Sequence, residues 1–108
     1  MESKMKLDVL DLIDQIVSLL ITCGWKDKAE WFQAKRMALE QLKEDTSEFN
    51  SILKEVANIL MGMGSFSDLP LVPVGNSSLT KEEARKLQWN LALRLSQLIK
   101  NRNLETHK

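Results

Sequence analysis

The 108-residue chain has few of the side chains from which most catalytic sites are built. It contains one cysteine and one histidine. The histidine, His107, is the second-last residue, in a stretch where the pattern predicts a polar tail. Because a Ser/His/Asp or Cys/His arrangement needs an ordered base, we expect no enzyme and no catalytic residues.

The scarcity of cysteine and of glycine-rich loops argues against further classes of site. Cys23 has no partner for an internal disulfide, which fits a reducing compartment. No glycine pattern has Walker or Rossmann spacing, and only carboxylates could supply metal ligands. We therefore expect no cofactor, no metal and no small-molecule substrate.

Long hydrophobic runs are also missing. The most apolar stretch, Ile16 to Ile21, is too short to cross a bilayer, and acidic residues precede it where a signal peptide carries basic ones. The sequence thus predicts a soluble, cytoplasmic protein with no membrane partner.

The chain has no excess of charge of either sign, with 15 basic and 15 acidic residues. Residues 1–80 nevertheless hold eight Lys/Arg against twelve Asp/Glu, and residues 81–108 hold seven against three. A nucleic-acid-binding protein usually carries a large positive excess, so the overall balance argues against a nucleic-acid partner. The basic C-terminal segment either attracts the acidic remainder of the chain or offers a basic surface.

What the sequence does have is helical periodicity, and it predicts an all-α, single-domain four-helix bundle over residues 1–108. The first helix is apolar over about 200° of its surface, so we expect it in the middle of the bundle. Gly24 ends it, and Thr80 and Glu83 form a capping box at the start of the last helix. The expected helices are 5–23, 27–43, 47–61 and 80–101, followed by a polar tail, 103–108.

A dense turn signal follows the third helix. Gly62 and Gly64 can take positive φ and end that helix. The side chains of Ser65 and Asp68 can accept freed backbone amides, and Phe66 can plug the end of the bundle. This structural role stands beside a role in partner binding. The rest of the connection, up to residue 79, is predicted to pack as a long loop through Leu71, Val72 and Val74.

Three groups of side chains are candidates for binding a partner. Two are acidic, one along the first helix and one at the corner between the second and third; each is either a solvated face or a docking element for a basic partner. The third is an apolar pair on the fourth helix beside Arg85, Lys86 and Lys100, which the long loop either covers or leaves open. The candidates are Asp8, Asp11 and Asp14; Glu40, Glu44, Asp45 and Glu48; and Trp89 and Leu93.

The string from Gly62 to Leu69 also resembles a known pattern. A helix, a GMGS-[FL]-x-D-L turn and a further helix are similar to a family of small all-helical bacterial proteins, found among the immunity proteins of contact-dependent growth inhibition and related toxin systems. The resemblance covers about residues 10–100. The matching positions are Leu19, Leu20, Gly24, Trp31, Ile59, Leu60, Gly62, Met63, Gly64, Ser65, Phe66, Asp68 and Leu69. The chain departs from the pattern at Pro70, which leaves the path of residues 70–79 open.

The resemblance implies a non-enzymatic inhibitor. Such a protein would bind the toxic C-terminal domain of a sibling cell's surface effector and cover its active site or substrate surface. Many such toxins are basic nucleases, so the two acidic groups are the first docking residues that we expect.

Two other functions remain open from the residues alone. One is an oligomerising adaptor that pairs through Trp89 and Leu93. The other is a nucleic-acid-associated helical module that uses the basic residues of the fourth helix, namely Lys81, Arg85, Lys86, Arg94, Lys100 and Arg102.

Overall fold

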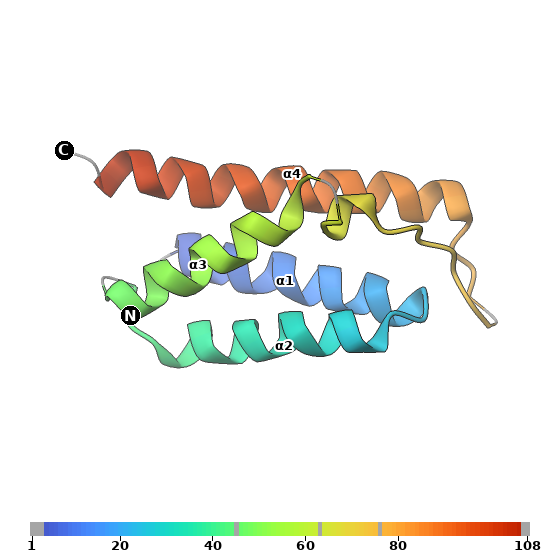
Figure 1. Ribbon diagram of the computed structural model, residues 1–108, viewed down its shortest axis with the longest axis horizontal. Helices are drawn as coiled ribbons and strands as arrows, with labels where there is room; N and C mark the ends of the chain where they lie inside the picture. Colours follow the sequence, from blue (N-terminus) through green and yellow to red (C-terminus); the bar gives the residue numbers. More distant parts are fainter. Residues whose placement is uncertain (1–3, 45, 63, 76, 107–108) are drawn as a thin grey trace.

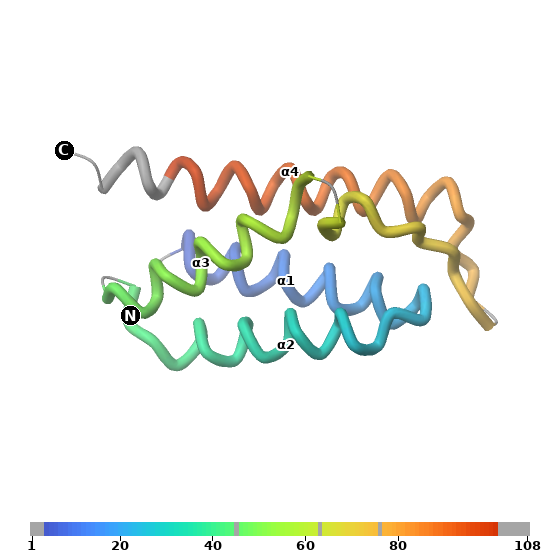
Figure 2. Tube along the Cα trace, in the orientation of Figure 1, coloured from blue at the N-terminus to red at the C-terminus, as the bar shows by residue number. Residues whose placement is uncertain are grey.

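The computed structural model describes residues 4–44, 46–62, 64–75 and 77–106, the last five by their backbone alone (Figures 1 and 2). This part of the chain is helical and contains no strand, which confirms the all-α four-helix bundle. The elements are α1 (Lys4–Thr22), α2 (Lys26–Gln41), α3 (Ser47–Leu60), the 3₁₀ turn η1 (Phe66–Asp68) and α4 (Lys81–Thr106).

Helix α1 has a neighbour on each side. It packs against α2 and against α4, and α3 closes the bundle by contacting α2 and α4 (Figure 1). Successive helices alternate in direction; short connections account for this between α1, α2 and α3, and the long loop returns the chain to the start of α4. Val9, Ile13, Ile16 and Leu20 recur at helical spacing along α1 and are completely buried. The broad apolar surface predicted for this helix is therefore used on two sides.

The capping box predicted at the start of α4 is present, and α3 also begins with a side-chain cap. Thr46 Oγ1 accepts the backbone N–H of Phe49 at 3.2 Å, at the start of α3. At α4, Thr80 N–H donates to Glu83 Oε1 at 3.0 Å and Glu83 N–H donates to Thr80 Oγ1 at 3.1 Å. These hydrogen bonds, chiefly that from the Thr80 backbone, lower the pKa of Glu83. The caps occupy amides that no helical carbonyl can reach.

The last helix is longer than expected. We predicted its end near residue 101 and a tail over 103–108, but α4 continues to Thr106. The prediction was wrong because residues 101–106 contain neither glycine nor proline, so nothing there stops a helix. His107 and Lys108 lie outside the described residues.

The turn after α3 is built from the predicted residues, with one correction. Gly62 has a φ of 109° and Gly64 a φ of 73°, and Asp68 Oδ2 accepts the Gly64 N–H at 3.1 Å. Ser65 was expected to accept an amide, but its buried hydroxyl instead donates to the Gly62 carbonyl. The C-terminal end of a helix leaves carbonyls, not amides, without helical partners. Ser65 supplies a donor to the Gly62 carbonyl, just beyond that end. Met63, which belongs to the resembling string, lies outside the described residues.

The side chain of Phe66 enters the core. It is almost completely buried and packs edge-to-face against Phe32 of α2, with ring centroids 5.8 Å apart. Through this ring contact the turn packs the end of α3 against α2.

The loop that follows is held at three points. The Trp25 indole N–H donates to the Pro70 carbonyl at 3.4 Å, and Val74 N–H donates to the Thr22 carbonyl at 2.9 Å. Leu71 is buried between them in sequence, whereas Val72 and Val74 stay about half exposed, so the predicted apolar packing holds for one of three residues. Figure 2 shows the chain leaving α3 beside the middle of α4 and running on to the end where α4 begins.

The buried side of α4 differs from a simple leucine stripe. The spacing of Ala84, Leu87, Leu91 and Leu95 predicts a buried stripe, but Leu87 is 39% exposed, and Gln88 and Ala92 are buried in its place. The reason is that α4 rests against α1 on one side and against α3 and η1 on the other. Its buried arc is therefore rotated toward the turn.

Candidate partner-binding surfaces

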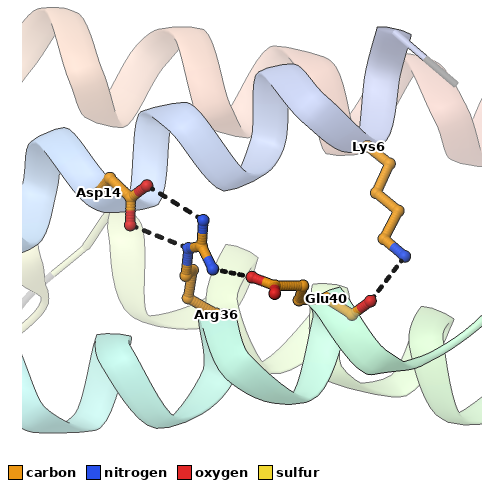
Figure 3. Close-up of polar contacts among 4 residues, drawn as sticks. All are labelled: Lys6, Asp14, Arg36 and Glu40. Atoms are coloured by element: carbon orange, nitrogen blue, oxygen red, sulfur yellow. Dashed lines mark hydrogen bonds and ion pairs between the residues drawn. The ribbon is translucent and has the colours of Figure 1, made fainter. Parts of the chain in front are cut away.

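The acidic stripe of α1 is partly engaged within the chain. Arg36 of α2 donates from Nε to Asp14 Oδ1 at 2.9 Å and from Nη2 to Asp14 Oδ2 at 3.3 Å (Figure 3). Its Nη1 pairs with Glu40 Oε2, one turn further along α2. Burial alone lowers the pKa of Arg36, but the hydrogen bonds and charges of Asp14 and Glu40 outweigh it and raise the pKa. Two predicted docking acids thus form an ion-pair network between α1 and α2.

A second internal contact involves a residue that sequence reasoning missed. Lys6 is only 5% exposed, and its Nζ donates to the carbonyls of Glu40 at 3.0 Å and Leu42 at 2.9 Å (Figure 3). These carbonyls lie at the end of α2, where helical partners run out and a cation suits the helix dipole. The ammonium is also 5.9 Å from the ring centre of Phe49. The available signal was a lysine three residues before Val9, on the apolar side of α1.

Asp8 and Asp11 face the basic helix instead of open solvent alone. They line a groove between α1 and α4, and Arg94 lines the same groove from α4. Asp11 Oδ2 also accepts the Gln15 amide N–H at 2.9 Å. Opposite charges that share a groove attract each other, which favours an intramolecular role for Asp8 and Asp11.

The acidic corner between α2 and α3 meets the α1 stripe at one point, where Arg36 pairs with both Asp14 and Glu40. Glu44 is half-buried and makes contacts within the chain, and Asp45 lies outside the described residues. Glu48 is exposed in the first turn of α3, where free amides favour an acid.

The apolar pair on α4 is open to solvent. Trp89 is 44% exposed and Leu93 is 43% exposed, so the alternative in which the long loop covers them is wrong. The loop reaches α4 through Gln88 instead. The side-chain amide of Gln88 donates to the carbonyls of Phe66 at 2.7 Å and Leu69 at 2.9 Å.

Polar and basic residues surround this pair. Glu82, Arg85, Lys86, Trp89 and Asn90 line one shallow depression of the surface. We call Arg85, Lys86, Trp89, Asn90 and Leu93 the α4 outer surface. Neither Arg85 nor Lys86 forms an ion pair with any residue that the structure describes.

The α4 outer surface stands on a firmly held helix. Gln88 anchors the turn beside Trp89, and Leu91 and Leu95 are buried one and two turns further along. Within the described part of the chain, every buried side-chain nitrogen or oxygen has a hydrogen-bond partner. The backbone that carries these binding candidates is thus held in place.

Among the described residues, no three His, Cys, Asp or Glu side chains come together as a metal site would require, and no helix has the length and apolarity needed to cross a bilayer. Cys23 is buried, and burial raises the pKa of its thiol, which disfavours the reactive thiolate. Comparison with family models, curated proteins and solved structures finds no match.

Proposed function

We propose that this protein is a bacterial immunity protein of the contact-dependent growth inhibition type. It binds a cognate toxin domain in the cytoplasm and neutralises it by covering its active site or substrate surface. The resemblance of the Gly62–Leu69 string supports the class of protein. The observation that carries the proposal is the α4 outer surface, where Trp89 and Leu93 are exposed on a helix that the core holds in place.

An inhibitor of this kind needs affinity and no chemistry of its own. Trp and Arg are the residue types that most often dominate the binding energy of protein interfaces. A surface that is fixed before binding loses little conformational entropy when the partner docks. The α4 outer surface meets both conditions.

The proposal is tested with the toxin domain encoded immediately upstream of this gene. Co-expression should restore growth of cells that express the toxin, and light scattering should show a one-to-one complex. A toxin domain of unrelated sequence is the control, and it should neither bind nor be neutralised. A folded, well-expressed chain that forms no complex with the upstream domain would contradict the proposal.

The nucleic-acid alternative has one observation in its favour, since Lys81, Arg85, Lys86 and Lys100 are exposed. Arg94, however, lies in the groove with the acids of α1, so the basic residues do not form one continuous stripe. This alternative predicts salt-dependent binding to duplex DNA or RNA. No binding at low salt would exclude it.

A further inference from the structure

We infer that the α4 outer surface is the docking site and that its partner is a protein surface with an apolar pocket rimmed by Asp and Glu. This inference rests on the proposed function and names the contact that the function would use. It departs from the first expectation, in which acids of this chain bind a basic partner.

The geometry favours a protein partner. Arg85, Trp89 and Leu93 follow each other at four-residue spacing, so they form one row along the helix. Lys86 and Asn90 form a second row at the same spacing. Figure 1 shows α4 along one edge of the bundle, with no other element beyond it. A flat row with a central tryptophan fits a pocket on another folded surface.

The charge of the surface decides the chemistry of the partner. Arg85 and Lys86 carry two positive charges, and Lys100 adds a third two turns beyond Leu93. Of the acids that the structure describes, Glu82 lines the depression and Asp68 lines a neighbouring one together with Arg85. Covering these cations without carboxylates would leave charges buried and unpaired. An acidic rim pairs with them and steers the encounter.

The test measures binding of a catalytically inactive form of the upstream toxin domain to four variants of the full chain. Trp89→Ala should weaken the Kd about 30-fold, as loss of an interface hot spot does. The double variant Arg85→Glu/Lys86→Glu should lower the association rate about tenfold at low salt, and high salt should shrink this effect.

Two variants on the same helix serve as matched controls. Leu87 is a partly exposed leucine on the α1 side, and Arg94 is a cation in the α1–α4 groove. Leu87→Ala and Arg94→Glu should each change the Kd by less than about threefold. Circular dichroism should show the same helical content for all four variants.

A spectroscopic readout locates the contact directly. The indole N–H signal of Trp89 should shift in NMR spectra when the toxin domain is added. The indole N–H of Trp25 donates to the Pro70 carbonyl and should keep its position.

The outcomes separate the two proposals. If a complex forms and both Trp89→Ala and Arg85→Glu/Lys86→Glu bind as tightly as the wild type, the docking surface is wrong and the proposed function stands. If no complex forms, the proposed function is wrong and the inference falls with it. Self-association that Trp89→Ala abolishes, or duplex DNA binding that Arg85→Glu/Lys86→Glu abolishes, would show another occupant and overturn the inference.

Discussion

The two longest helices of this protein lie side by side but use their charged residues in different ways. In α1, Lys6 caps the end of α2 and Asp14 pairs with Arg36, so charges hold the fold together. In α4, Arg85 and Lys86 project into solvent without an ion pair among the described residues. Both helices have neighbours on two sides, so the difference lies in what faces the charges. The carbonyls at the end of α2 lie opposite Lys6 and Arg36 lies opposite Asp14, whereas Arg85 and Lys86 have no such partner among the described residues. We therefore expect changes to the charged residues of α1 to alter stability and changes to Arg85 and Lys86 of α4 to alter binding.

The largest effect should appear within α4, between its inner and outer leucines. Leu91 is buried and Leu93 is 43% exposed. Leu91→Ala should lower the free energy of unfolding by about 2–5 kcal/mol, because it leaves a cavity in the core. Leu93→Ala should change it by less than about 0.5 kcal/mol. Urea denaturation measures both, and equal losses would show that α4 has no free face.

The next effect concerns the buried charge of α1. Lys6→Ala should cost about 2–3 kcal/mol, since two carbonyls at the end of α2 lose a charged donor. Lys4→Ala, at an exposed position of the same helix, is the matched control and should cost less than about 0.5 kcal/mol. A Lys6→Ala protein as stable as the control would remove the contrast between α1 and α4.

A somewhat smaller effect is expected at Gln88, a buried polar residue of α4. Gln88→Ala should cost about 2 kcal/mol, because the carbonyls of Phe66 and Leu69 lose their partner. Amide hydrogen exchange of Asp68 in η1 and of Leu69, which follows it, should accelerate at the same time. Gln97→Ala, at an exposed site, should leave the exchange unchanged. Unaltered protection of η1 in the Gln88 variant would show that this side chain does not hold the turn.

The smallest effect compares two arginines. Arg36→Gln should cost at most about 1 kcal/mol, because its partners Asp14 and Glu40 are about half exposed and solvent screens the pairs. Arg94→Gln should cost close to nothing, since Arg94 forms no ion pair among the described residues. The difference should vanish at 1 M salt. A difference that survives high salt would point to packing of the Arg36 stem instead of charge.

Much of the fold was predictable because it depends on short-range rules. The caps at Thr46 and Thr80 and the positive φ of Gly62 and Gly64 each involve residues within a few positions of one another. The extent of α4 was misjudged because no stop signal exists near residue 101 and helices without one continue. The candidate surfaces were harder, because exposure depends on neighbours. The choice between a covered and an open Trp89 could not be made until the loop was placed against Gln88.

The sequence by itself determined the four helices, their order and the turn that ends α3, since helical period, caps and glycine act locally. Only the tertiary structure decided that Lys6 and Arg36 bind groups of a neighbouring helix, while Arg85 and Lys86 form no ion pair among the described residues. The physical reason is that a charged side chain has the same local preference in every amphipathic helix. Its role depends on whether a carbonyl, a carboxylate or water lies opposite, and that is settled when the helices pack.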